Sequence, residues 1–553
     1  MKLKRTVVAP ALVAGVALVS GGWLLQQGVS DQKNIYEQAR VFDEVMTLIS
    51  ERFVDRPKSG DLYRMATEGM IEELGDPHTS FLTPEEFNEF YTTMSGEYAG
   101  IGAQIVERDG WVTVLASLPG TPAERAGLRA GDRMVEIAGR PTKGWNSDQA
   151  VKVLRGARGT AVNVKILRIG VEQPIPFSIT REEIHLSSVP YAFIMGDGVG
   201  YVNLSIFSGA SAKEVRENVL KLRGQGMKKL ILDLRENPGG LLDQGVGVSE
   251  LFLKPGQAVV ETRGRTAADN TVARARGGEI APEMPIVVLV DEYSASAAEI
   301  VAGALQDHDR AVVLGARSYG KGSVQDLFPL SGGNFLKVTT SKWFTPVGRS
   351  IQKDLPKTGD AQATVAAATE TVDEEGAPIQ RQGAQPDTTR PYRTATGRVV
   401  YGGGGIVPDM TVRPDTATAA EQEFFRAAAK GGAVFNDVLF RYAIEYGRQH
   451  AEIRPDFVVT PEMRREFYNR LRAANLAITP EQFEGARTFI DRRIGQEVVQ
   501  HKFGANAAAQ RVTVADRAVA DAFSLLKRAD SPAALLRLVP AQPVSRTTPA
   551  RAR

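Results

Sequence analysis

The feature that most constrains this chain is a regular alternation of two kinds of apolar segment between residues 199 and 314. Short β-type runs alternate there with segments whose apolar residues recur at helical spacing. This rhythm predicts a layered α/β core. The predicted strands are Val199–Ile206, Lys229–Leu234, Ile286–Val290 and Ala311–Leu314, and the predicted helices are Ala212–Leu222, Leu241–Leu253 and Ala295–Leu305.

Composition removes several classes of chemistry. The 553 residues are enough for about three to four domains of ~150 residues each. The absence of Cys excludes disulfides, Cys-ligated metal sites and a cysteine nucleophile. The five His form no His-x-x-x-His pair, and a net charge of +2 does not suggest a broad basic face. We therefore expect no metal, no cofactor and no nucleic-acid partner, and a chemistry that uses hydroxyl, amine or carboxylate groups.

The amino-terminal segment predicts export. Lys2, Lys4 and Arg5 precede the uncharged run Val7–Leu25. As a helix this run would span about 28 Å, close to the thickness of a bilayer core. Positive charge before an apolar run keeps the amino end in the cytoplasm. We expect residues 1–30 to be an inner-membrane anchor in the cell envelope, with the bulk of the chain on the periplasmic or extracytoplasmic side; a cleaved signal peptide is the alternative.

The pattern of apolar and polar residues along the rest of the chain predicts a multidomain α/β protein. An N-terminal helical region is expected at 31–95, with amphipathic stretches at Asn34–Val54 and Leu62–Leu74. The other expected segments are a β-rich unit at 96–182, the α/β core at 183–415 with an insertion at 353–401, a helical region at 416–530 and a disordered tail at 531–553. The two helical regions are candidates for self-association or adaptor binding, with ordinary intramolecular packing as the alternative.

The residues after Ile286–Val290 are typical of a turn that carries a nucleophile. Ser294 and Ser296 lie where the predicted strand gives way to a helix. Unpaired N–H groups in the first turn of a helix stabilise a developing oxyanion, and the small neighbouring alanines let a substrate backbone approach. The alternative is that such a Ser only caps the helix.

Lys321 is the candidate base. It lies between Gly320 and Gly322, just after a predicted strand. An ordinary Lys, with a pKa of about 10.4, is protonated at neutral pH. Burial disfavours the ammonium and lowers the pKa, so a desolvated Lys321 beside a Ser would accept the hydroxyl proton. Gln325 would orient this amine by a hydrogen bond. The alternative is a solvated Lys in a glycine-rich turn.

These segments, together with Asn237–Gly240, resemble the carboxyl-terminal processing proteases, the tail-specific proteases of serine peptidase family S41. The resemblance implies a Ser/Lys dyad whose members lie 25 residues apart, with a supporting Gln four residues further on. This spacing selects Ser296 rather than Ser294 as the nucleophile, with Lys321 and Gln325. The similarity covers most of residues 35–352 and includes Gly75–Thr79, Ile300–Asp307 and Thr345–Gln352.

The resemblance also implies a fold and a reaction. The fold is a ClpP/crotonase-like βα protease core with an inserted PDZ domain. The reaction is amide hydrolysis through an acyl-enzyme, in which Lys321 deprotonates Ser296 and then protonates the leaving amine. The implied oxyanion donors are the backbone N–H groups of Ala297 and Gly239. The implied substrates are exported proteins with exposed carboxyl termini.

The β-rich unit resembles a circularly permuted PDZ domain of the bacterial kind. In such domains a peptide tail adds as a β-strand and its carboxylate binds backbone N–H groups of a loop. The Pro122–Asp132 segment carries part of the resemblance, and Ile101 with Leu154 is expected to form an apolar pocket. Arg155 resembles an arginine that couples peptide binding to the protease core in some relatives. The implied loop residues are Tyr98, Ala99, Gly100, Ile101 and Gly102.

Three other functions remain open. A Ser–His hydrolase would use His308 or His78, although neither has a recognisable catalytic partner in the sequence. An inactive PDZ scaffold would require the loss of Ser296 or Lys321, and both are present. A crotonase-like acyl-CoA enzyme would need a coenzyme A pocket and no PDZ unit.

Overall fold

The computed structural model describes residues 35–168, 171–353, 387–412 and 416–540. The chain forms two compact units. The first comprises Met1–Leu82, Leu327–Val338 and Lys357–Asp360, and the second comprises Thr83–Asp326, Thr339–Pro356 and Ala361–Arg553. The membrane anchor predicted at 1–30 lies outside the described residues. In the part that is described, we find no helix with both the length and the apolar character needed to cross a bilayer.

The described residues of the first unit are mainly helical. Residues 35–52 form a helix, followed by α2 (Ser59–Glu72) and the short strand β1 (Ser80–Leu82). β1 pairs antiparallel with Phe335–Lys337. The helix at 35–52 leaves most of its apolar side chains in solvent, with Ile35 at 63% and Phe42 at 50% exposure.

The β-rich unit forms a six-stranded antiparallel sheet of the order β3-β4-β5-β7-β8, with β6 beside β5, and two short helices. The chain enters this unit through β2 and leaves it through β9, and these two strands pair antiparallel with each other. The entry and the exit of the unit therefore lie side by side. The helices are α4 (Pro122–Ala126) and α5 (Ser147–Leu154), and α3 (Pro84–Ser95) precedes the unit. The strands are β2 (Glu97–Gly100), β3 (Ala103–Arg108), β4 (Trp111–Ser117), β5 (Arg133–Ile137), β6 (Arg140–Pro141), β7 (Ala161–Leu167), β8 (Ile175–Thr180) and β9 (Glu182–His185).

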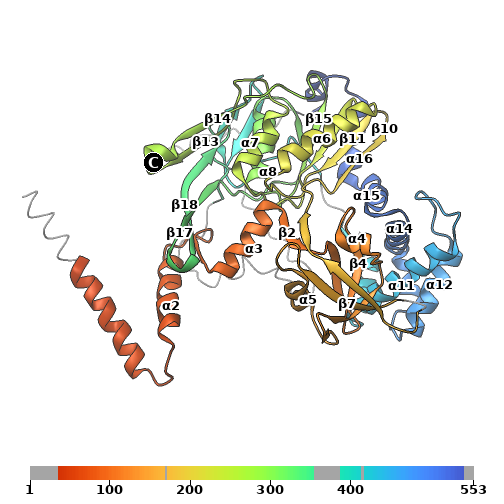
Figure 1. The fold of residues 1–553 in the computed structure, drawn as a ribbon. Coiled ribbons are helices and arrows are strands. Elements are labelled where there is room, and N and C mark those ends of the chain that lie inside the picture. Colours follow the sequence, from red (N-terminus) through yellow and green to blue (C-terminus); the bar gives the residue numbers. More distant parts are fainter. Residues whose placement is uncertain (1–34, 169–170, 354–386, 413–415, 541–553) are drawn as a thin grey trace, which may run out of the picture. The chain divides into compact units, whose positions relative to one another are not determined.

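The predicted α/β core is confirmed (Figure 1). Its six-stranded sheet has the order β10-β11-β12-β15-β16-β21, and the strands are parallel except for β10, which pairs antiparallel with β11 at one edge. The strands are β10 (Tyr191–Gly196), β11 (Val199–Asn203), β12 (Lys229–Asp233), β15 (Ile286–Val290), β16 (Val312–Gly315) and β21 (Met410–Thr411). The helices that connect them are α6 (Ser211–Gly224), α7 (Leu242–Glu250) and α8 (Ala297–Asp307).

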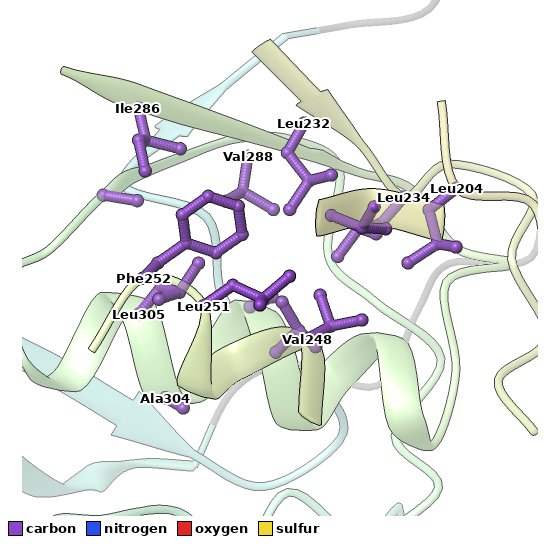
Figure 2. Packing of buried hydrophobic residues seen from close by; sticks show 14 of the residues in the cluster. Leu204, Leu232, Leu234, Val248, Leu251, Phe252, Ile286, Val288, Ala304 and Leu305 are labelled. Atoms are coloured by element: carbon purple, nitrogen blue, oxygen red, sulfur yellow. The ribbon is translucent and has the colours of Figure 1, made fainter. Parts of the chain in front are cut away.

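Both faces of this sheet are covered, which explains why its strands read as continuous apolar runs. On one face, Ile286 and Val288 pack with apolar residues of α7 and α8, and Figure 2 shows these two side chains with Leu232, Val248 and Phe252. The alternate residues Val287 and Leu289 point to the other face. There they pack against residues of α16 (Arg517–Lys527).

The carboxyl-terminal helical region therefore has two parts, a division that the sequence did not predict. The helices α10 to α14 build an apolar cluster of their own around Phe424, Phe467 and Ile490. In contrast, α16 packs on the core sheet and forms its second covering layer. The helices are α10 (Ala419–Ala429), α11 (Val434–Gln449), α12 (Pro461–Ala473), α13 (Pro480–Gly485), α14 (Arg487–Phe503), α15 (Ala505–Val514), α16 and α17 (Pro532–Leu536).

Two predicted irregular segments contain regular structure. The expectation of a disordered tail from residue 531 does not hold for α17, because Leu535 packs into the apolar cluster beneath the core sheet and is only 1% exposed. Within the predicted insertion at 353–401, β19 (Asp387–Arg393) pairs antiparallel with β20 (Val399–Gly402). Val400 and Tyr401 of this hairpin are buried. Residues 354–386 and 541–553 lie outside the described part of the chain.

The remaining strands of the core form hairpins beside the main sheet. β13 (Ala258–Gly264) pairs with β14 (Thr271–Arg274) and with the carboxyl-terminal half of β18 (Phe335–Phe344). β17 (Ser323–Pro329) precedes β18 and begins two residues after Lys321. Lys321 therefore lies just before β17, and Gln325 lies on β17 itself, beside the main sheet.

Candidate active site

Ser296 lies at a sharp turn between a buried strand and a buried helix. All five residues of β15 are buried, and α8 begins at Ala297. Ser296 adopts φ 54° and ψ −113°, a conformation that a residue with a side chain seldom adopts and that costs about 1–3 kcal/mol. Strained strand-to-helix turns of this kind present the side chain of a catalytic Ser at the edge of the sheet in other hydrolases.

The hydroxyl of the neighbouring Ser294 is engaged in a hydrogen bond that holds the fold. Its side chain is fully buried, and its hydroxyl donates to the carbonyl of Leu234 at 2.8 Å. Asp291 Oδ1 accepts hydrogen bonds from the Ser294 N–H and from the Glu236 N–H, each at 3.0 Å. This arrangement ties the turn before Ser296 to the loop after β12.

Glu299 connects the segments of the two predicted dyad residues. Its carboxylate lies in the first turn of α8 and is fully buried. Oε2 accepts the backbone N–H of Ser296 at 2.8 Å and that of Lys321 at 2.9 Å. Oε1 accepts the Ser318 hydroxyl at 2.6 Å and the Gly320 N–H at 2.7 Å. Because one oxygen binds both amides, the Ser turn and the Lys loop meet at a single point.

Burial sets the electrostatics of Glu299. Desolvation raises the pKa of this carboxyl from 4.5 to about 6, although the four donors oppose that rise by stabilising the anion. The carboxylate is therefore ionised at neutral pH. Sequence reasoning missed Glu299, although the Ser-x-x-Glu spacing from Ser296 is the signature of a capping box and signals such a contact.

The main chain of Lys321 is fixed on both sides. Its N–H binds Glu299, and its carbonyl accepts the indole N–H of Trp343 at 3.0 Å. Trp343 is only 1% exposed, whereas Lys321 is half-buried. The predicted desolvation of the Lys321 amine stays a prediction.

Gln325 lies on β17, and its amide nitrogen donates to Ser323 Oγ at 2.9 Å and to Thr339 Oγ1 at 3.1 Å. These bonds hold the Gln325 side chain along the strand that follows Lys321. Its role in orienting the Lys321 amine stays a prediction.

The loop after β12 packs directly on Ser296. Gly239 has φ 93°, and a Cβ built there would lie 2.7 Å from Ser296 Cβ and 3.0 Å from the amide nitrogen of Ala297. Only glycine fits this position, because any side chain would meet the turn at Ser296. The structure thus brings the two predicted oxyanion donors, Gly239 and Ala297, next to Ser296.

One of these amides is engaged in the structure. The Gly239 N–H donates to Oδ1 of Asn237 at 2.8 Å, so an oxyanion at this place would compete with that oxygen. The Asn237 side chain in turn donates to the carbonyl of Leu204 at 2.7 Å. Within the described residues, the amides of Ala297 and Gly240 make no hydrogen bond.

The predicted histidine alternative is not supported for His308. This residue caps the far end of α8, the helix that begins beside Ser296. Its Nδ1 lies 3.0 Å from the Gln257 amide nitrogen and its Nε2 lies 2.7 Å from the carbonyl oxygen of Ala258. Both ring nitrogens therefore have structural partners.

The predicted tail-binding loop lies at the entry to the β-rich unit. Tyr98, Ala99 and Gly100 belong to β2, where Tyr98 pairs with Ile184. The Arg155 guanidinium lies 4.6 Å from the centre of the Tyr98 ring, so Arg155 contacts the loop rather than standing apart from it. Burial raises the pKa of the Tyr98 hydroxyl, and Arg155 opposes that rise.

Two residues of this region are parts of the unit's core. Ile101 and Leu154 are buried in the same apolar cluster, with 3% and 5% exposure. Gly102 has φ 74°, and a Cβ there would lie 2.4 Å from Thr121 Cβ. The loop therefore rests on the core and has no space for a side chain at Gly102.

Comparison with known proteins agrees with this architecture. The pattern of Peptidase family S41 matches residues 198–361, and that of a PDZ domain matches residues 113–168. The carboxy-terminal-processing protease of Bartonella bacilliformis is 37% identical over 315 residues, which is 56% of this chain and 72% of that protein. A probable CtpA-like serine protease of Staphylococcus aureus is 35% identical over 309 residues, 56% of this chain and 62% of that protein.

Among solved structures, the PDZ domain of a carboxy-terminal protease from Vibrio cholerae, determined with a bound peptide, is 27% identical. The match covers 16% of this chain and 99% of that domain, with a TM-score of 0.16. The extent and identity of the sequence matches decide the assignment. The chain belongs to the carboxy-terminal-processing proteases of peptidase family S41.

Proposed function

We propose that this serine peptidase uses a Ser296/Lys321 dyad to cleave exported proteins that its PDZ domain selects by their carboxyl-terminal tails. The observation that best supports the dyad is the pair of hydrogen bonds to Glu299 Oε2. The Ser296 amide binds this oxygen at 2.8 Å and the Lys321 amide binds it at 2.9 Å. Two segments that lie far apart in sequence are held together by one buried carboxylate, beside a loop that has no room for a side chain at Gly239.

The proposed reaction proceeds in two halves. The neutral Lys321 amine takes the proton of the Ser296 hydroxyl, and Oγ attacks the scissile carbonyl carbon. The tetrahedral oxyanion is stabilised by the Ala297 N–H and by an N–H of the loop that carries Gly239. The Lys321 ammonium then protonates the leaving amine nitrogen, which leaves an acyl-enzyme. Lys321 next deprotonates a water molecule that attacks the ester, and the proton returns to Ser296 as the acid product leaves.

Cleavage of an unfolded test protein with an apolar carboxyl terminus tests the dyad. We expect Ser296→Ala and Lys321→Ala each to lower kcat by about 10⁴-fold or more. Matched controls on exposed residues, Ser331→Ala and Lys342→Ala, should leave it unchanged. Cleavage retained in both dyad variants would rule out the proposed mechanism.

Tail selection has a separate test. A test protein whose last residue is changed from apolar to charged should show a raised KM, because the predicted tail site is built on the apolar cluster that contains Ile101. An equal KM for the two substrates would argue against recruitment by the tail.

The proposal also covers the cellular setting. The apolar run Val7–Leu25 would anchor the enzyme in the inner membrane with the peptidase in the periplasm, and the exposed apolar side chains of the helix at 35–52 would bind an adaptor or a second copy. Membrane fractionation of the full chain tests the first statement. Light scattering with and without the substitution Phe42→Ser tests the second.

A further inference from the structure

A polar cavity lies at the carboxyl ends of the core strands, between the sheet and the carboxyl-terminal helices. It has a volume of about 340 Å³. Tyr201, Asp233 and Arg235 line it from the sheet, and Gln496 and Asp516 line it from the helical region. Two parts of the chain that are separated by 281 residues thus share one polar site.

Arg235 is the residue that joins the two sides of this cavity. Its Nη2 donates to Asp233 Oδ2 at 2.7 Å, and its Nη1 donates to both carboxylate oxygens of Asp516 at 3.0 Å. Asp233 also accepts the Tyr201 hydroxyl at 2.7 Å and is almost fully buried. One guanidinium therefore bridges a carboxylate of the sheet and a carboxylate of the helical region.

Asp516 has a second contact on its own side. It is the N-cap of α16, and its Oδ1 accepts the Val519 N–H at 2.9 Å. Because α16 packs across the back of the core sheet, Asp516 is fixed relative to the strands on which the active site is built. The carboxylate is a fixed point to which Arg235 is attached.

Arg235 opens the loop that carries the oxyanion amides. Glu236 follows it with φ 58°, and the Glu236 N–H binds Asp291, which begins the turn to Ser296. Gly239 lies three residues further on, against Ser296. The guanidinium of Arg235 therefore fixes the first residue of this loop, and Asp291 fixes the second.

We propose that Asp516 is a positioning residue for catalysis: it holds Arg235, and through Arg235 it sets the amides of the loop 236–240 against Ser296. This inference rests on the proposed Ser296/Lys321 mechanism. It gives the helical region a part in the reaction that is distinct from simple packing, because a misplacement of about 1 Å in a reacting geometry can cost up to ~10²-fold in rate.

The chain offers a matched control for this contact. Lys229, at the amino end of the same strand β12, donates to Asp530 at 3.2 Å. That pair also ties β12 to the carboxyl-terminal helical region, yet it lies at the opposite end of the strand from Arg235. Asp530→Asn removes a tie to the helical region and leaves the loop contact intact.

The test measures kcat, KM and inhibition by a peptide boronic acid, whose tetrahedral Ser adduct places an oxygen against the oxyanion donors. Asp516→Ser keeps a side chain able to cap α16 but too short to hold Arg235. We expect it to lower kcat about tenfold, to weaken the boronic acid by the same factor and to change KM less than twofold. Asp516→Asn keeps the cap and the shape without the charge, and should lower kcat about threefold. Asp530→Asn should change none of these values.

An unchanged kcat in Asp516→Ser would overturn the inference, as would an equal loss in Asp530→Asn or a loss confined to KM. If Asp516→Ser does not fold, the comparison of Asp516→Asn with Asp530→Asn decides in the same way. Failure of the mechanism itself is recognised separately, because Ser296→Ala would then retain cleavage, whatever the result for Asp516.

Discussion

The protease core and the carboxyl-terminal helical region both contain charged side chains in pairs, but these pairs differ in how deeply they are buried. In the core, Glu299 and the ion pair between Arg349 and Asp307 are fully buried and exclude water. In the helical region, the pairs that attach it to its neighbours are partly exposed, such as Arg108 with Asp437 at 3.4 Å. A buried charge must be matched by partners, whereas an exposed pair contributes little. The difference teaches that fully buried charges hold segments of the core together, whereas partly exposed pairs attach the helical region to the core and to the PDZ domain.

The largest effect is expected for Arg349. Its Nη2 donates to Gln306 Oε1 and to Asp307 Oδ1, each at 2.6 Å, and its Nη1 donates to the Tyr401 carbonyl at 3.1 Å. Arg349→Met leaves the Asp307 carboxylate buried without its cation, so we expect the free energy of unfolding to fall by about 3–5 kcal/mol. Chemical denaturation measures this loss.

The double variant with Asp307→Asn provides the control, because it removes the orphaned charge together with its partner. It should recover part of the stability that Arg349→Met loses. A single variant as stable as the wild-type chain would show that the buried pair is not what holds this part of the core.

The next effect concerns Glu299 and has a definite sign with pH. Burial raises the pKa of this carboxyl from 4.5 to about 6, so the folded chain holds the proton more tightly than the unfolded chain does. The resulting stability is fully present below pH 4.5 and is lost as the pH rises through about 6. The free energy of unfolding should therefore fall by about 2 kcal/mol across this window because of Glu299.

Glu299→Gln removes this titration, and its stability should change less than that of the wild-type chain between pH 4.5 and 6. The amide NH₂ also replaces one of the two carboxylate oxygens, which sets a donor against the N–H groups of Ser296 and Lys321 or against that of Gly320, so kcat at neutral pH should fall about 100-fold. Denaturation at several pH values and cleavage assays measure the two effects. Parallel stability profiles for the two proteins would contradict the assignment of the pKa shift.

Local patterns in the sequence predicted the core better than its connections. The β/α rhythm from Val199 to Leu314 predicted the strands and helices because apolar periodicity is a local property. One part of the contact that Glu299 makes could also be read locally. The Ser-x-x-Glu spacing from Ser296 predicts the bond between Glu299 and the Ser296 amide, although not the bond to Lys321. In contrast, α16 as the second layer of the sheet and Asp516 as the partner of Arg235 depend on residues almost 300 positions apart. Helical periodicity predicted α16 but not the surface on which it packs.

The smallest effect is expected where the PDZ domain meets the helical region. The Arg108 guanidinium lies 4.0 Å from the centre of the Phe440 ring, and Nη1 donates to the Asn436 carbonyl at 3.3 Å. Burial lowers the pKa of Arg108, while Asp437 opposes that change. Arg108→Ala should lower the free energy of unfolding by about 1 kcal/mol, because a partly desolvated cation–π contact and an ion pair are lost.

Arg158→Ala, which removes the exposed pair with Glu183 in the same PDZ domain, is the matched control and should change stability by less than about 0.5 kcal/mol. Limited proteolysis adds a second measurement: loss of the Arg108 contact should speed cleavage within the PDZ domain and within α11. Salt should change the Arg158 result more than the Arg108 result, because the Arg108 pair is less exposed than the Arg158 pair and is screened less. If the free energy of unfolding fell equally in the two variants, partial burial would not strengthen an ion pair. Differences in stability between the core and the attached helical region would then reflect only how many contacts each makes.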